Sequence, residues 1–107
     1  DMHDNNLIYH KGDVVYETEL NESETAHNPE LQVMRFLHDV NLQAKAKGVL
    51  PDPLSGNVGA LSATEMFDTI SRIKGLSGEH IVLRAVTLND TYTAGPLGID
   101  IIVEPIQ

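Results

Sequence analysis

Three aspartates are the residues of this chain best suited to do chemistry together. Asp13 belongs to a first predicted hairpin, Asp90 ends a predicted strand, and Asp100 lies on the strand predicted beside it. If their carboxylates met, they could hold a hard divalent cation and support metal-assisted hydrolysis, as in hydrolases and nucleases. The simpler explanation is that the acids follow solvent faces of strands and the starts of helices. We favour it, and expect no catalytic residue, no metal and no other cofactor.

The other reactive side chains form no recognised catalytic pattern. None of the five histidines pairs at the i, i+4 spacing typical of zinc ligands on a helix. The run from Ser55 to Gly59 lacks the lysine of a phosphate-binding loop, and Ser62 is expected to cap a helix. The chain has no Cys, which excludes thiolate metal sites and cysteine nucleophiles.

The most distinctive segment is residues 89–97. Its Asn-Asp pair favours a turn, and its Gly-Pro pair allows a backbone conformation that other residues resist. A shaped hairpin connection is the simpler interpretation, and a ligand or interaction loop is the alternative. In the second case the contacting residues would be Asp90, Tyr92, Thr93 and Gly95.

Four β-favouring runs are expected to position these residues. Residues 7–9 and 14–20 flank a Gly-containing turn and predict a hairpin. Residues 79–88 and 97–104 predict a second hairpin, in which residues 79–88 are apolar on both faces and suit a central strand. In residues 14–20 we expect one face to carry Val14, Tyr16, Thr18 and Leu20, and the other Val15, Glu17 and Glu19.

Two helices are predicted between these hairpins. The first runs from Pro29 to about Lys47. Asn28 is expected to cap its start, and Gly48 to supply the left-handed residue after its end. The second follows a capping box at residues 62–65 and ends at Gly75. The apolar stripes of the two helices are expected to form the core. The alternative is a ligand pocket lined by Met34, Met66 and Phe67. The stripe residues are Leu31, Val33, Met34, Leu37, Val40 and Ala44 on the first helix and Ala63, Met66, Phe67, Ile70 and Ile73 on the second.

The order of elements, β-β-α-α-β-β, predicts an α+β fold. We expect a mostly antiparallel four-stranded sheet with two helices packed on one face, in a single domain over residues 7–107. Residues 1–6 are expected to be a disordered or expression-derived tail. A net charge of -9 argues against nucleic acid and against direct contact with an anionic membrane. The apolar runs are too short to span a membrane.

Several short stretches resemble a known family. They are residues 9–15, 47–59, the strand at 83–86 and, most specifically, the Tyr-Thr-Ala-Gly-Pro run at 92–96. The chain resembles, from about Leu7 to Val103, the carboxy-terminal domain of bacterial membrane-anchored coiled-coil proteins known as domain of unknown function 3084. The resemblance implies transmembrane segments and a long coiled coil ahead of this domain, and it implies no catalytic residue.

Together these observations predict a non-catalytic interaction or assembly domain, with a metal-dependent hydrolase or nuclease-like domain using clustered carboxylates as the alternative. We expect it to self-associate as a homodimer through uncovered strand edges. The chain begins with Asp1, which suggests a fragment, and we expect an absent N-terminal region to tether the soluble domain to a bacterial membrane. The extracytoplasmic side is favoured.

Overall fold

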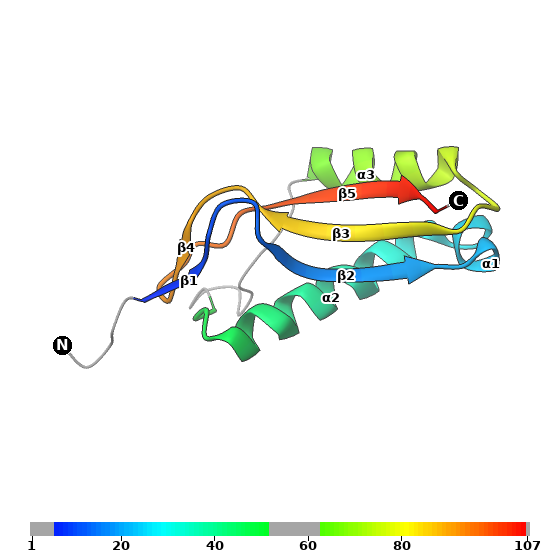
Figure 1. The fold of residues 1–107 in the computed structure, drawn as a ribbon. Coiled ribbons are helices and arrows are strands. Elements are labelled where there is room, and N and C mark those ends of the chain that lie inside the picture. Colours follow the sequence, from blue (N-terminus) through cyan, green and yellow to red (C-terminus); the bar gives the residue numbers. More distant parts are fainter. Residues whose placement is uncertain (1–5, 52–62, 107) are drawn as a thin grey trace.

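The computed structural model describes residues 6–51 and 63–106, which contain five strands and three helices (Figure 1). In chain order these are β1 (Leu7–Tyr9), β2 (Val14–Leu20), α1 (Glu22–Ala26), α2 (Pro29–Lys47), α3 (Ala63–Gly75), β3 (Ile81–Thr87), β4 (Thr91–Tyr92) and β5 (Ile99–Pro105).

The strands form two antiparallel sheets, so the prediction of one four-stranded sheet is wrong. One sheet has the order β2-β3-β5, and the other pairs β1 with β4. The reason lies in the turn between β1 and β2. Gly12 donates to the carbonyl of Thr87 and Thr87 donates to the carbonyl of Asp13, each over 2.9 Å. The turn is thus bonded to the end of β3, and β1 continues beside β4 instead of folding back along β2.

A β-bulge at Val15 reverses the predicted face of the first residues of β2. Val14 pairs with Val86, but the next paired residue is Tyr16, which lies opposite Ala85. The extra residue shifts the side-chain alternation by one position. Val15 is therefore buried and Val14 exposed, so each valine lies on the opposite face from the one that the regular alternation predicted.

The two long helices have the predicted bounds, and their ends are only partly as expected. Gly48 adopts the left-handed conformation at the end of α2, with φ of 112°. Asn28 precedes α2 with φ of 51°, and its side chain makes no capping hydrogen bond. The predicted cap of α3 at Ser62 lies outside the described residues. The short helix α1 was not predicted, although Asn21 and Glu24 form a capping box at its start.

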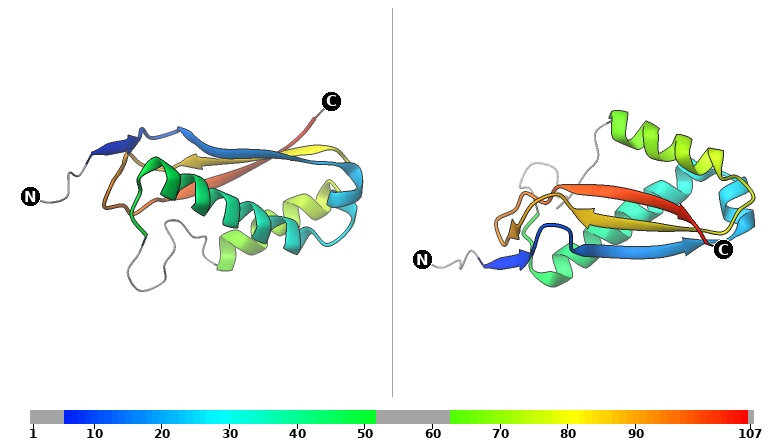
Figure 2. Two further views of the ribbon diagram at one scale, coloured as in Figure 1. Left: turned by 90° about the horizontal axis from the view of Figure 1, so that it is seen from below. Right: turned by 45° about the horizontal axis from the view of Figure 1, so that its top comes forward.

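Both long helices cover the same face of the three-stranded sheet (Figure 2). They run antiparallel, and Lys74 near the end of α3 lies 3.2 Å from Glu30 at the start of α2. The core between helices and sheet contains Val33, Phe36, Val40, Ile73, Ile81, Leu83 and Ala85.

Four residues placed in the core are exposed instead, so those assignments were wrong: Leu31, Met34, Ala63 and Phe67. The alternative of a ligand pocket lined by Met34, Met66 and Phe67 was also wrong, because Met34 and Phe67 lie on the surface. Phe36 is buried instead, with its ring centroid 5.7 Å from that of Tyr16 on β2.

Candidate interaction site

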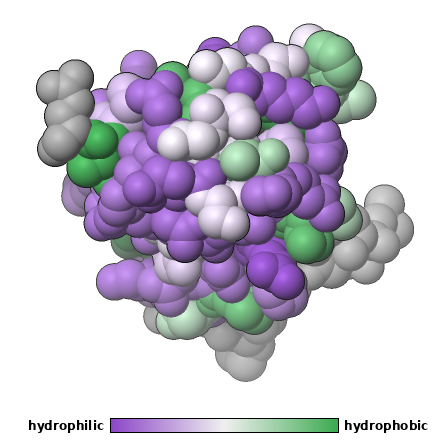
Figure 3. Space-filling view, turned by 90° about the vertical axis from the view of Figure 1, so that its right-hand side faces the viewer, coloured by the Kyte–Doolittle hydropathy of each residue, from purple (hydrophilic) through white to green (hydrophobic). Residues whose placement is uncertain are grey.

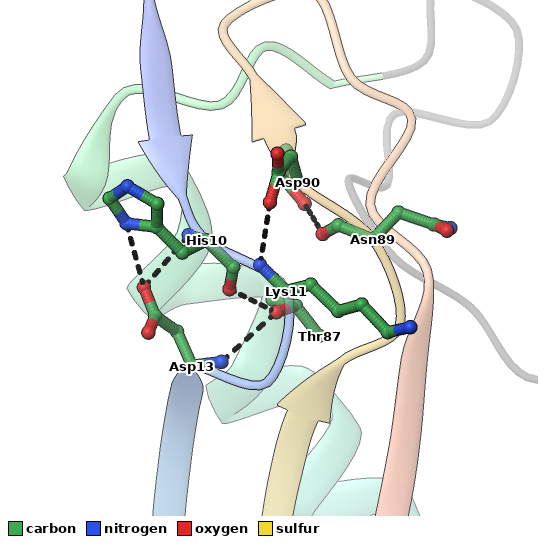
Figure 4. A network of polar contacts seen from close by, with 7 residues as sticks. His10, Lys11, Asp13, Thr87, Asn89 and Asp90 are labelled. Atoms are coloured by element: carbon green, nitrogen blue, oxygen red, sulfur yellow. Dashed lines mark hydrogen bonds and ion pairs between the residues drawn. The ribbon is translucent and has the colours of Figure 1, made fainter.

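Two of the three aspartates considered for a metal site, Asp13 and Asp90, belong to one polar network around the β1–β2 turn near the end of β3 (Figure 4). Each carboxylate already has a structural role. Asp13 Oδ2 accepts from the backbone N–H of His10, and Asp90 Oδ1 accepts from that of Lys11, both over 2.8 Å. Asp100 is an exposed residue of β5 opposite Val86. In residues 6–51 and 63–106, no three His, Cys, Asp or Glu side chains are placed to hold a metal ion.

Thr87 completes this network from inside the fold. Its buried hydroxyl donates to the carbonyl of His10 over 2.7 Å and accepts from the N–H of Asp13 over 3.2 Å. Among residues 6–51 and 63–106, the buried hydroxyl of Tyr9 finds no hydrogen-bond partner. Burial, with a smaller contribution from the Asp13 charge, raises the pKa of Tyr9 above its ordinary value. The cluster therefore fastens the β1–β2 turn to the end of β3.

The predicted interaction loop is also tied into the fold. The Thr93 hydroxyl and backbone bond with Asn6, and the Thr93 carbonyl accepts from Leu50 over 2.8 Å. Gly95 has φ of 70° and donates to the Tyr92 carbonyl. Tyr92, opposite Leu7 in the small sheet, has an exposed side chain available to a partner. Binding of a ligand or partner by this loop stays a prediction.

Helix α2 carries a second apolar stripe that faces away from the sheet. With 3.6 residues per turn, its members fall within an arc of about 80°. Met34 is 61 % exposed and Leu42 52 % exposed. The first part of the stripe borders an open groove of about 400 Å³ that Arg35 and Asp39 also line. The stripe consists of three apolar residues, Leu31, Met34 and Leu42, together with the exposed polar residue His38 between them.

Sequence reasoning missed this stripe because it merged it with the buried one. The buried positions are Val33, Phe36, Val40 and Ala44. The outward positions repeat at nearly the same spacing, two residues earlier. Two sets of residues with the same helical spacing, offset by two positions, are the signal that could have separated the outward stripe from the buried one, since one such set accounts for only one face of a helix.

The two edges of the three-stranded sheet differ. Leu88 donates to Gly98 and Ile106 donates to His80, so even-numbered residues of β3 bond to β5. Because bonding alternates along an antiparallel strand, the odd-numbered residues of β3 bond to β2. The N–H and C=O groups of Glu17 and Glu19 on β2 therefore point outward, away from β3.

The edge formed by β5 is more obstructed than the β2 edge. Arg72 of α3 reaches the outward carbonyl of Ile101 over 3.5 Å, and the strand ends at Pro105, which has no N–H. Along β2 the glutamates have partners on the open face of the sheet: Glu17 lies 2.7 Å from Arg84, and Glu19 2.9 Å from His80. The hydrogen bond that Arg84 Nε donates to the Glu17 carboxylate is the main cause of the raised pKa of Arg84.

The end of the molecule beside α1 carries no large apolar patch. Hydrophilic side chains cover most of that face, and the hydrophobic ones lie mainly around its outline (Figure 3). Across the described part of the chain, no helix combines the length and the apolar character needed to cross a bilayer.

These features define an acidic α+β domain in which an antiparallel pair of helices covers one face of a three-stranded sheet. The chain belongs to the family described as the DUF3084-associated C-terminal helical hairpin, which it matches over residues 9–105. The resemblance read from the sequence is thereby confirmed. The helical hairpin of the family description corresponds to α2 and α3. The structure also contains a three-stranded sheet, which the description does not mention. No curated protein and no solved structure matches the chain.

Proposed function

We propose that this is a non-catalytic assembly domain that self-associates through the outward stripe of α2. The observation that carries the proposal is that α2 has exposed apolar side chains, Leu31, Met34 and Leu42, on the face opposite the one that the sheet covers. A surface helix needs one apolar face to pack on its own domain. The second face is explained if another polypeptide covers it.

The helix is a better candidate surface than the strand edges that the sequence suggested. Two β2 edges brought together would place Glu17 and Glu19 against the same residues of a second copy, and like charges opposite one another destabilise strand pairing. The β5 edge is partly occupied by Arg72 and ends at Pro105. Self-association through the α2 stripe meets neither obstacle.

We further propose that the domain belongs to a bacterial membrane-anchored coiled-coil protein and is held on the extracytoplasmic side by a preceding region. The support is the resemblance, which implies transmembrane and coiled-coil segments ahead of the domain. Fractionation of the parent protein, followed by protease accessibility in intact cells, tests it. Recovery of the parent in the cytosolic fraction would overturn this proposal and leave self-association to be judged separately.

Sedimentation velocity of the domain from micromolar to several hundred micromolar tests self-association. We expect the sedimentation coefficient to rise with concentration. Met34→Lys should abolish the rise, because it places a charge in the middle of the stripe. The matched control is Ile106→Lys, which adds the same charge at an exposed apolar residue on the open face of the sheet. A single monomeric species at every concentration would overturn the proposal.

A further inference from the structure

We propose that the partner of α2 is the α2 helix of a second copy, packed antiparallel about a two-fold axis, with Arg35 of each copy beside Asp39 of the other. This inference rests on the proposed self-association and specifies its geometry. Three properties of the helix carry it: the position of the stripe, the place of the two charges beside it, and the local charge balance.

The stripe is nearly symmetric about its own centre, as a two-fold contact requires. It extends from Leu31 to Leu42, which is 12 residues, and the 11 steps between them span about 16 Å along the helix. In an antiparallel pair centred near residue 37, Leu31 of one copy lies opposite Leu42 of the other. Met34 of each copy is then level with residues 39–40 of the other copy. Both copies therefore bury Met34, which is the most exposed residue of the stripe.

The charges next to the stripe are complementary under the same symmetry. Arg35 and Asp39 lie on one flank of the stripe, and both border the groove beside it. A two-fold axis perpendicular to two antiparallel helices brings the same flank of each copy together. Because 35 and 39 are equally distant from residue 37, Arg35 is then level with Asp39 of the second copy, and two equivalent ion pairs form.

Both side chains are available for such pairs. Within the described ranges, no ion pair joins Arg35 or Asp39 to another residue, although their i, i+4 spacing would allow one with each other. They are also the only Asp, Glu, Lys or Arg between Leu31 and Leu42. This segment of α2 is therefore neutral in a chain of net charge -9, so the helix itself adds little repulsion between two copies, although Glu19 and Glu24 lie around the same hollow as Arg35 and Asp39.

The contact is small, since the stripe covers only about three helical turns. Small interfaces belong to weak or transient complexes. We therefore expect a dissociation constant in the micromolar range or weaker.

A charge-exchange experiment tests the geometry. Dissociation constants are measured by sedimentation equilibrium for the wild-type domain, Arg35→Glu, Asp39→Arg and the double variant that carries both changes. Each single variant places like charges together twice per dimer and should weaken it about tenfold. The double variant restores opposite charges and should return to within about threefold of the wild type. Lys11→Glu, which changes the net charge as Arg35→Glu does at an exposed turn residue, should behave as the wild type.

Each outcome is decisive, provided that circular dichroism shows every variant folded. Weakening by both single changes with recovery in the double variant supports the antiparallel α2 pair. Unchanged dimerisation in the single variants, or failure of the double variant to recover, would overturn this geometry while leaving self-association intact. A wild-type domain that stays monomeric would overturn the proposed function, and this inference with it.

Discussion

Replacing Thr87 by valine tests whether the turn between β1 and β2 is fastened to the end of β3 by a side-chain hydroxyl. Valine has almost the same shape and keeps the buried methyl group, so the change removes hydrogen bonds with little change in packing. Two bonds are lost: the 2.7 Å bond to the His10 carbonyl and the 3.2 Å bond from the Asp13 N–H.

The expected loss of stability follows from these two bonds. The shorter bond contributes about 1 kcal/mol in net terms. The longer one contributes less, about 0.5 kcal/mol, because the Asp13 N–H also donates to the His10 carbonyl over 3.0 Å and keeps that partner. The free energy of unfolding should fall by about 1.5 kcal/mol, and Tm by roughly 6 °C for a domain of this size.

Urea denaturation followed by circular dichroism measures the change, and Thr18→Val is the matched control. Thr18 lies on the adjacent strand β2 and, in the described part of the chain, its hydroxyl has no hydrogen bond. The same substitution there should leave stability within about 0.5 kcal/mol of the wild type. If Thr87→Val costs no more than Thr18→Val, the Thr87 hydroxyl does not help to hold the turn, and only the backbone bonds between the turn and β3 fasten it.

Three further predictions concern ionisable groups. Tyr9→Phe should stabilise the domain by about 1 kcal/mol, because it removes a buried hydroxyl that bonds to no group in the described part of the chain. The raised pKa of Tyr9 means that the native state favours the neutral phenol, so native stability falls as the pH rises through and above about 10. The phenylalanine variant has no such group, so its advantage in urea melts should widen at that pH. A constant difference between the two proteins would contradict the assignment. The pKa of Glu30 is lowered, mainly by a hydrogen bond from its own backbone N–H and also by Lys74. The charged carboxylate therefore stabilises the native state, and Glu30→Gln should be less stable than the wild type at pH 7. The difference should disappear as the pH falls below about 4.5, because the carboxylate of the wild type is then protonated. Calorimetric titration with Mg²⁺, Mn²⁺ or Ca²⁺ should give no binding heat at the Asp13 and Asp90 carboxylates, and a micromolar site lost in Asp90→Asn would refute their purely structural role.

The sequence predicts the parts of the fold that local signals decide. The bounds of α2 follow from the Asn-Pro pair at its start and from Gly48 at its end, where the chain takes the left-handed conformation. The central position of β3 follows from apolar side chains on both of its faces, and the structure confirms it between β2 and β5. These signals lie within a few residues of the element that they define.

What the sequence does not predict depends on residues far apart in the chain. The pairing of β1 with β4 joins Leu7 to Tyr92, and strands of two or three residues carry too little pattern to specify a distant partner. The bulge at Val15 is equally hidden, since valines at both 14 and 15 satisfy either alternation.

The candidate site shows the same division between local and distant information. The spacing on α2 reveals two apolar stripes, but only the position of the sheet determines that Phe36 is buried and Met34 exposed. For Asp13 and Asp90 the sequence suggested solvent-facing acids, with a metal site as the alternative, and the backbone N–H groups that their carboxylates bind could not be foreseen.

The direction of the outermost strands has a mechanical consequence. β1 and the carboxyl end of β5 lie at opposite ends of the molecule (Figure 1). Tension applied between Leu7 and Pro105 would act along β5, so the ladder to β3 would be loaded in shear, with its hydrogen bonds strained together and not opened one at a time. β1 would be pulled lengthwise past β4 in the same way. The domain is thus arranged to transmit a stretching force along its length, with the two-residue strand β4 as the first link expected to yield.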